Sequence, residues 1–287
     1  MRTIAVTGSF GYLGKHLINL CLQRGFSIRA LGRAKRQENS SQVEDIFFDL
    51  SAPVSSETLN GADILIHLAH DFSGLSLKDS LEINFEGSRK LFLAAKEGGL
   101  RKIIFVSSMA AYPGCRSIYG RAKLAIEEES IKFGAWVIRP GTIYGGSGEG
   151  LFAGLRSMAT KLPFIPLIDG GRQQLFLVHI DDLCEALLKI AFDDSLTAAI
   201  EPLSLAASRP LELREILGQL AQQAGKKSRF LYVPSLFVLP AMKLAESIGI
   251  KLPFRSDSLV SIRNMNPNAR VESNFLGIKL REYIQSN

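Results

Sequence analysis

Cysteine is scarce in this 287-residue chain, and its three residues, Cys21, Cys115 and Cys184, form no C-x-x-C pair. An odd number without paired spacing argues against a disulfide framework and predicts a reducing, cytoplasmic location. The chain also lacks a polybasic tail. Its net charge of +6, from 34 basic and 28 acidic residues, is expected to be distributed along the whole sequence. Neither a nucleic acid nor a membrane surface is therefore expected as a partner.

Long apolar runs are missing as well, so no membrane span is predicted. The most apolar late stretch, residues 231–250, is interrupted by Pro234, Pro240, Lys243 and Glu246. We expect it to form a helix buried under a C-terminal lobe or at a subunit contact. A strand pattern begins almost at the first residue, which argues against a signal peptide.

Several chemical motifs are absent. The glycines of 145–150 are not followed by the Lys-Ser/Thr ending of a P-loop, and Ser108 does not lie in a G-x-S-x-G turn. The pair His67-x-x-His70 has no Cys or acidic ligand at suitable spacing. No metal site and no hydrolase triad are therefore predicted.

A glycine-rich segment stands near the start of the chain, between an apolar run at 3–6 and a helical pattern from about residue 13. Gly8 would permit a tight turn, Gly11 would let the backbone approach a pyrophosphate, and Gly14 would allow close helix packing. Free N–H groups and the helix dipole would hold the phosphates. The spacing is G-x-x-G-x-x-G rather than G-x-G-x-x-G, and a plain structural turn remains the alternative.

Apolar strands alternate with helices through the first half of the chain. Strands are expected at 27–31, 44–48, 63–68, 102–107 and 135–139, and helices at 76–97 and 118–132. This pattern predicts an α/β fold with a doubly wound parallel sheet. We place a Rossmann domain at 1–145, with a returning segment near 174–192, and a smaller substrate lobe mainly at 146–287. The second part is expected to contain helices at 181–191 and 211–224 and short strands at 175–178, 203–206 and 230–233.

Tyr119 and Lys123 form a Tyr-x-x-x-Lys pair on the helix expected at 118–132, where residues four apart share a face. A lysine ammonium and a bound oxidised nicotinamide would favour phenolate, making Tyr119 a proton acceptor from a hydroxyl or a donor to a carbonyl. Ser108 ends a strand at the edge where parallel sheets bind ligands, so its hydroxyl could contact the same substrate oxygen. Alone, the pair could be an incidental surface pair, and Ser108 a simple strand terminator.

Taken together, these features resemble the extended short-chain dehydrogenase/reductase family, the NAD(P)-dependent epimerase/dehydratase group. The matching segments are 7–14, Asp49-Leu50, 66–69, Asn84 within 83–87, 105–108, the Tyr119/Lys123 pair, 139–145 and 178–182. The resemblance implies catalytic roles for Ser108, Tyr119 and Lys123, with Lys123 also holding the nicotinamide ribose. It also implies that Asp49 bonds the adenine amino group, that Leu68, Ala69 and His70 lie beside the cofactor, and that Pro140 packs near the nicotinamide. With Arg33, discussed below, the expected cofactor-binding set is Gly8, Ser9, Phe10, Gly11, Tyr12, Leu13, Gly14, Arg33, Asp49, Leu50, Leu68, Ala69, His70, Asn84, Tyr119, Lys123 and Pro140.

Two departures from the family pattern concern the substrate. Only ten residues separate Ser108 from Tyr119, so the loop that helps shape the pocket in sugar-nucleotide members is short. Those members commonly carry an arginine seven residues before the position of Asp182, and here that residue is Leu175. Arg172 lies nearby but out of register. A leucine cannot pair with a diphosphate, which argues against a nucleotide-sugar substrate.

The end of the second expected strand bears on the cofactor. Arg33, Lys35 and Arg36 follow it, and no acid occurs before Glu38. An acid at this place would bond a ribose 2′-hydroxyl, whereas an arginine can pair with a 2′-phosphate. NADP(H) is therefore the preferred cofactor, mainly through Arg33, with NAD(H) as the alternative if these charges are only solvated.

The expected activity is hydride transfer between nicotinamide and a secondary alcohol or carbonyl carbon of a small molecule, a sugar or sugar nucleotide being one class. Epimerase, dehydratase and simple reductase chemistry stay open. The competing hypothesis is a non-catalytic NADP(H)-binding accessory or redox-sensing protein of the same fold. A homodimer is a possible assembly, and residues 231–250 are then a candidate for the subunit contact.

Overall fold

Seven strands form one parallel sheet at the centre of the computed structural model, which describes residues 2–34, 41–74, 76–146, 149–250, 252, 254–266 and 269–283. Lys35, Arg36 and Glu38 lie outside these residues. In spatial order the strands are β11 (Leu203–Leu205), β6 (Trp136–Pro140), β5 (Lys102–Val106), β4 (Ile64–His67), β1 (Thr3–Thr7), β2 (Ser27–Gly32) and β3 (Val43–Phe47). Every neighbouring pair is parallel, which confirms the doubly wound sheet.

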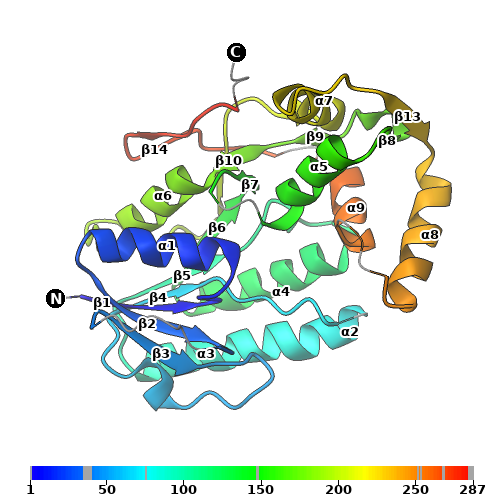
Figure 1. Ribbon diagram of the computed structural model, residues 1–287. Helices are drawn as coiled ribbons and strands as arrows, with labels where there is room; N and C mark the ends of the chain where they lie inside the picture. The colour runs from blue at the N-terminus through cyan, green and yellow to red at the C-terminus, as the bar shows by residue number, and fades with distance from the viewer. Residues whose placement is uncertain are drawn as a thin grey trace.

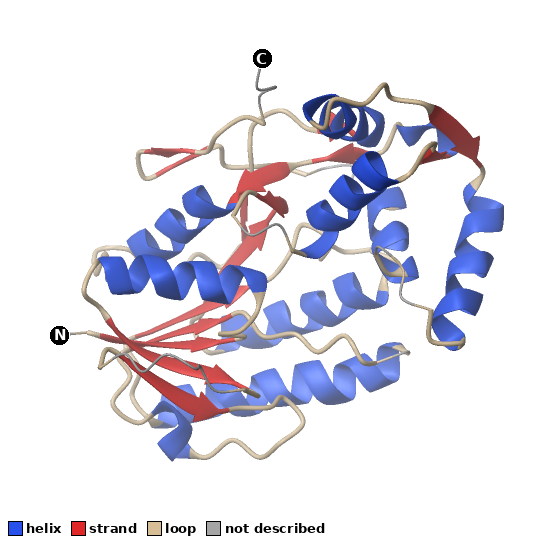
Figure 2. Ribbon diagram, in the orientation of Figure 1, coloured by secondary structure: helices blue, strands red, loops and turns tan. Residues whose placement is uncertain are grey.

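Helices cover both faces of this sheet, because its strands are apolar on both sides (Figure 1, Figure 2). α1 (Tyr12–Gln23) and α6 (Ile180–Phe192) lie on one face, and α3 (Glu86–Glu97) and α4 (Ile118–Lys132) on the other. Successive β1 side chains point to opposite faces. Ile4 and Val6 join the core beneath α1 and α6, whereas Ala5 joins the core beneath α3 and α4.

β11 comes from the part of the chain that we assigned to the C-terminal lobe, yet it forms an edge of the central sheet beside β6. The returning segment also belongs to the main body, because α6 packs against α1. The division of the chain into 1–145 and 146–287 stays a prediction.

The helix expected over 76–97 is continuous but not uniform. α2 (Leu77–Ser80) starts at a capping box in which Ser76 and Asp79 exchange hydrogen bonds of 3.1 Å. A π-helical turn, η2 (Leu81–Phe85), then leads into α3. Such turns are uncommon and often mark functional sites. Here the turn carries Asn84, whose contacts are described below.

The smaller lobe has its own core, to which Phe152, Leu155, Ile216, Leu217 and Ile262 contribute. Its helices are α5 (Gly150–Lys161), α7 (Leu213–Gln223), α8 (Ser235–Ser247) and α9 (Ser256–Arg263), and its short pairings are β8 (Ile165–Ile168) with β13 (Phe230–Val233) and β9 (Gln174–Leu175) with β12 (Leu211–Glu212). β7 (Thr142–Tyr144) pairs with β10 (Leu177–His179) between the lobe and the sheet, and β14 (Asn274–Phe275) forms a hairpin with β15 (Ile278–Lys279). Single turns occur at η1 (Ser56–Leu59) and η3 (Asp169–Gly171).

The apolar stretch 231–250 is not buried under the lobe, which was one of its two expected places, while the other, a subunit contact, stays a prediction. This stretch forms β13 and α8, and α8 lies at the edge of the molecule, where it contacts α9 (Figure 1). Leu236, Phe237 and Leu244 face outward. In the part of the chain that the structure describes, no helix is long and apolar enough to cross a bilayer.

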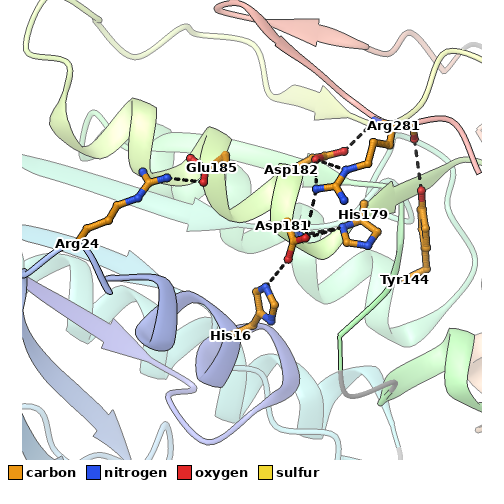
Figure 3. A network of polar contacts seen from close by, with 8 residues as sticks. All are labelled: His16, Arg24, Tyr144, His179, Asp181, Asp182, Glu185 and Arg281. Atoms are coloured by element: carbon orange, nitrogen blue, oxygen red, sulfur yellow. Dashed lines mark hydrogen bonds and ion pairs between the residues drawn. The ribbon is translucent and has the colours of Figure 1, made fainter. Parts of the chain in front are cut away.

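Charged side chains on α6 connect α1 to the C-terminal segment (Figure 3). Asp181 accepts from His16 Nε2 of α1 at 2.6 Å and also contacts Arg281 at 3.2 Å. Asp182 accepts from the Arg281 backbone N–H and from its Nε, at 2.8 and 2.7 Å. The segment around 178–182 therefore joins three parts of the chain, in addition to any role near a ligand.

Candidate active site

The glycine turn has the close contacts that its spacing predicted. Gly8 adopts φ +64°, and an added Cβ there would lie 3.0 Å from the Ala69 nitrogen. A Cβ on Gly14 would lie 2.2 Å from the Gly8 carbonyl oxygen, so this glycine lets α1 pack on the turn itself. A Cβ on Gly11 would meet only the Gly8 oxygen, at 3.2 Å, and Gly11 lines the large cavity described below. The turn thus leaves backbone accessible at the N-terminus of α1, as a pyrophosphate requires.

The end of β1 is tied to the end of β4 through one hydroxyl. Thr7 Oγ1 accepts from the N–H groups of Leu68 and Ala69, at 3.0 and 3.1 Å. Its own proton is then directed to His67 Nδ1, 2.7 Å away, and His67 Nε2 donates to Ser88 Oγ at 2.8 Å. Burial, and then the nearby Lys123 charge, lower the pKa of His67 to about 3. His67 is therefore a neutral, structural histidine that fixes the cavity wall.

A cavity of about 800 Å³ runs from the glycine turn to Tyr119 and is closed on one side by the smaller lobe. Its lining includes most of the predicted site, namely Gly8, Phe10, Gly11, Tyr12, Leu13, Arg33, Asp49, Leu50, Leu68, Ala69, His70, Ser108, Tyr119, Lys123 and Pro140. Gly14, Ser9 and Asn84 do not line it. The Ser9 hydroxyl turns to the Leu31 carbonyl at 3.0 Å. Asn84 clamps the backbone of Asp71, accepting from its nitrogen at 2.7 Å and donating to its oxygen at 2.9 Å.

Ser108, Tyr119 and Lys123 meet at the inner end of this cavity. Burial raises the pKa of Tyr119 to about 12, although a hydrogen bond with Ser108 lowers it in part. Lys123 is 2% exposed and donates to the Val106 carbonyl at 2.9 Å. Burial lowers the pKa of Lys123 to about 7, while the charge of Glu127 raises it. Without added positive charge the tyrosine thus stays protonated at neutral pH.

Glu127 continues the same helix face, four residues beyond Lys123. It is buried and accepts two hydrogen bonds from Arg139 of β6, one from Nε at 2.8 Å. Burial raises the pKa of this carboxyl, and the hydrogen bond from Arg139 opposes that shift. Our sequence analysis missed Glu127, although the spacing 119, 123, 127 places it on the face of the pair.

The smaller lobe holds the start of α4. Asp257 of α9 accepts from the backbone N–H groups of Ile118 and Tyr119, at 2.8 and 2.9 Å. Ser117 supplies the local cap by accepting from Gly120 N–H at 3.0 Å. A carboxylate at a helix N-terminus also stabilises the helix dipole. The two residues that join here lie 138 positions apart, so no local pattern marks Asp257 in the sequence.

Two aromatic rings, those of Phe72 and His70, pack against the ring of Tyr119. Phe72 stacks on the Tyr119 ring with centroids 5.7 Å apart, and His70 meets it edge-on at 4.9 Å. Burial, followed by the Lys123 charge, lowers the pKa of His70 well below its usual value. Its Nδ1 is enclosed and has no hydrogen-bond partner among the described residues. Arg255 of the lobe donates to the Phe72 carbonyl and so ties this loop to the lobe.

Arg33 lies at the opposite end of the cavity, where an adenosine ribose is expected. Its guanidinium is 3.1 Å from Asp71 and 3.9 Å from Asp49, and its side chain is 68% exposed. Hydrogen bonds from Ser51 lower the pKa of Asp49, whose Oδ1 accepts both of them, at 2.8 and 2.6 Å. Arg33 is therefore a largely exposed cation with two carboxylates beside it.

The lobe contributes a group of apolar side chains to the cavity, namely Leu151, Leu175, Phe176, Ile262 and Met265. Polar and charged residues of the lobe line it as well, namely Glu149, Arg255, Asp257, Ser258 and Ser261. Leu175 is buried within β9, and Arg172 is exposed and absent from the cavity wall. In the ranges that the structure describes, no group of three or more His, Cys, Asp or Glu side chains could hold a metal ion.

One cavity connects the glycine turn, at the carboxyl end of β1, with the buried Tyr119 and Lys123, which is the arrangement expected of a nucleotide-cofactor-dependent oxidoreductase or epimerase. Residues 4–197 match the NAD dependent epimerase/dehydratase family, and the chain belongs to that family. This family is a class of NAD(P)-dependent enzymes, which agrees with the resemblance identified from the motifs. The curated relatives include reductases, and their names describe lipid-like as well as sugar-nucleotide substrates.

Several curated relatives align over most of this chain, two reductases among them. The ceramide reductase of Caulobacter vibrioides is 29% identical over 250 residues, which cover 85% of this chain and 77% of that protein. The 4-hydroxy-2-methyl-3-oxo-4-farnesyl-3,4-dihydroquinoline-1-oxide ketoreductase of Stigmatella aurantiaca is 26% identical, covering 86% and 80%. Among solved structures, MoeE5 in complex with UDP-glucuronic acid and NAD has a TM-score of 0.71 and 20% identity, covering 81% and 85%. That likeness concerns the fold.

Proposed function

We propose that this protein is an NADP(H)-preferring reductase of a ketone with large apolar substituents, or the corresponding alcohol dehydrogenase. The observation that carries the proposal is the apolar wall of Leu175, Phe176, Ile262 and Met265 near the Tyr–Lys pair. Such a wall suits hydrocarbon and offers no cation to a diphosphate at position 175. The names of the two curated relatives, with a ceramide and a farnesyl-bearing ketone, support the same substrate class.

The residues present fit a dinucleotide. Gly11 leaves the space that a side chain would fill, and the N-terminus of α1 points its N–H groups there. Asp49 and Leu50 would hold the adenine end, Leu68 and Ala69 would line the middle, and Pro140 would pack near the nicotinamide. The bound nicotinamide would supply the hydride, or accept it in the reverse direction.

The proposed chemistry leaves the proton to the protein. In reduction, the Tyr119 hydroxyl donates its proton to the carbonyl oxygen as the carbonyl carbon gains hydride, and Ser108 donates a hydrogen bond to the same oxygen. Lys123, held by the Val106 carbonyl, lowers the barrier by stabilising the phenolate that remains. The proton is replaced from solvent, so one ketone, one hydride from the reduced nicotinamide and one proton would yield one alcohol and the oxidised nicotinamide.

The substrate proposal is tested by following reduced nicotinamide with purified protein and two substrate sets. Long-chain ketones should be reduced with a kcat/KM well above that of UDP- or dTDP-linked keto sugars, and Leu175→Arg should selectively impair the long-chain set. Turnover of the nucleotide sugars alone, or their epimerisation without net oxidation, would refute the proposal.

The cofactor preference is tested separately by dissociation constants for NADPH and NADH at fixed salt. We expect NADPH to bind more tightly, because Arg33 can pair with the 2′-phosphate. Arg33→Ala should remove most of this preference, whereas Arg89→Ala, at an exposed arginine outside the cavity lining, should not. Equal affinities of the parent for the two cofactors would overturn the preference, and an unchanged preference in Arg33→Ala would assign it to another residue.

The cytoplasmic location also stays a prediction. The three buried free cysteines agree with it.

A further inference from the structure

Exposed apolar side chains are concentrated on one segment of the smaller lobe. Of the fifteen large apolar side chains that are exposed in the described residues, eight belong to residues 230–250. We call these eight the α8 patch, and they are Phe230, Leu231, Tyr232, Leu236, Phe237, Leu244, Ile248 and Ile250. A cluster of this kind is uncommon on a monomeric protein and marks an interaction surface.

The orientation of α8 is fixed by contacts that place its polar groups inward. Ser235 is buried, and Glu246 accepts from the backbone N–H and the hydroxyl of Ser256 on α9, both at 2.6 Å. The opposite face carries Leu236 (76% exposed), Phe237 (69%) and Leu244 (65%). Because the polar contacts hold the helix to the lobe, its apolar face remains turned to solvent. The helix itself lies at the edge of the molecule (Figure 1).

Positive charge is concentrated along the same segment. Residues 226–255 contain six Lys or Arg and one Glu, hence five of the six net positive charges of the chain. The remaining residues, with 28 basic and 27 acidic side chains, are almost neutral, so the charge is not spread out as we had expected. Lys227, Arg229 and Lys243 are exposed, while Lys251 lies outside the described residues.

We propose that the α8 patch docks on the surface of an anionic lipid bilayer. Leu, Ile and Phe side chains can enter the acyl boundary, Tyr232 suits the headgroup region, and the flanking lysines and arginines pair with anionic lipids. At 13 residues α8 is too short to span the hydrocarbon core, so it lies in the interface.

A second copy of this chain is the other candidate occupant, and the charge argues against it. Two copies that met through their α8 patches would bring the exposed cations Lys227, Arg229 and Lys243 of each copy together, which is unfavourable. An anionic bilayer instead neutralises them. Docking also places α9, which contacts the inward face of α8 and lines the cavity, behind α8 and one helix away from the bilayer. This last consequence rests on the proposed lipid-like substrate, whereas the docking itself does not.

The test is co-sedimentation of the full chain with vesicles of phosphatidylcholine, alone or mixed with an equal amount of phosphatidylglycerol. Binding should be strong only with phosphatidylglycerol and should weaken with salt. The triple variant Leu236→Ser/Phe237→Ser/Leu244→Ser should lose most of it. Ile200→Ser/Phe47→Ser, at side chains that are 84% and 68% exposed elsewhere, should bind like the parent. NADPH affinity reports that each variant is folded.

Lys227→Glu/Arg229→Glu provides a second variant that leaves the apolar side chains in place. It should weaken binding to the mixed vesicles by at least about 25-fold, since each basic residue near the surface contributes about fivefold. Absence of vesicle binding by the parent would overturn the proposal, as would equal loss in the matched control. A dimer in light scattering that the triple variant dissociates, without vesicle binding, would assign the patch to a second copy. None of these outcomes depends on enzyme activity.

Discussion

Asp257→Ala should slow catalysis by disturbing a helix on which Asp257 does not reside. The change removes two carboxylate acceptors, at 2.8 and 2.9 Å, from the N–H groups of Ile118 and Tyr119. Hydrogen bonds to a charged group contribute about 1.5–3 kcal/mol each, and loss of an N-terminal cap typically costs about 0.5–2 kcal/mol. Ser117 still caps Gly120, and water can reach the half-buried site, so we expect a loss of about 1–3 kcal/mol in unfolding free energy.

The expected effect on kcat follows from the loss of the hydrogen bond between the Tyr119 backbone and Asp257. The backbone N–H of Tyr119 donates one of the two hydrogen bonds, so displacement of this backbone moves the Tyr119 hydroxyl, the proposed acid/base, relative to Ser108. If about 1.4 kcal/mol of positioning is lost in the transition state, kcat falls about tenfold. NADPH affinity should change far less, because the glycine turn is not touched.

Steady-state kinetics, urea unfolding and NADPH titration on the parent, Asp257→Asn and Asp257→Ala measure these effects. Asp257→Asn keeps one oxygen acceptor and should lie between the other two proteins in both kcat and stability. Parental kcat in a folded Asp257→Ala protein would refute the reasoning. A loss of NADPH affinity as large as the loss of kcat would show that the lobe acts on the cofactor site instead.

Three further predictions concern the cavity. Tyr119→Phe should lower kcat by about 10²–10⁴-fold while NADPH still binds, and near-parental kcat would remove Tyr119 as the acid/base. Gly11→Val should lower NADPH affinity strongly but lower the free energy of unfolding only slightly, because the side chain would fill the pyrophosphate space. Unchanged affinity in the folded variant would contradict this. Burial lowers the pKa of Lys123 from 10.5 to about 7, so between these values the unfolded chain binds one more proton. This group should make unfolding free energy rise with pH by up to about 1.4 kcal/mol per unit, and Lys123→Met should flatten that rise in urea-unfolding experiments. An equal slope in both proteins would show that Lys123 stays charged in the fold.

Local pattern was sufficient for the sheet and for the helix of the Tyr–Lys pair. α4 spans Ile118–Lys132, as predicted, because its ends have a serine cap and a glycine stop. The buried strands are continuous apolar runs, which are identified by their short length between flanking turns rather than by periodicity. The π-helical turn at Leu81–Phe85 left no such signal, since one extra residue within a helix hardly changes its apolar spacing.

Contacts between distant residues were not predictable from local pattern. Asp257 caps α4 only because the lobe brings α9 to its N-terminus. The predicted burial of residues 231–250 under the lobe was wrong, because apolar spacing indicates an apolar face but not whether protein covers it; a subunit contact there stays a prediction. Leu203–Leu205 showed a strand pattern, yet a three-residue strand carries no information about which sheet it joins.

The place of β11 in the sheet has a consequence for synthesis on the ribosome. The strand beside β6 is residues 203–205, and Leu280 is buried in the same core as β1 and α1. A nascent chain that has emerged only as far as β6 therefore has an unpaired sheet edge and an uncovered core face. We expect the nucleotide-binding half to reach its final stability only after most of the lobe has been translated, so that it does not mature as an independent N-terminal unit.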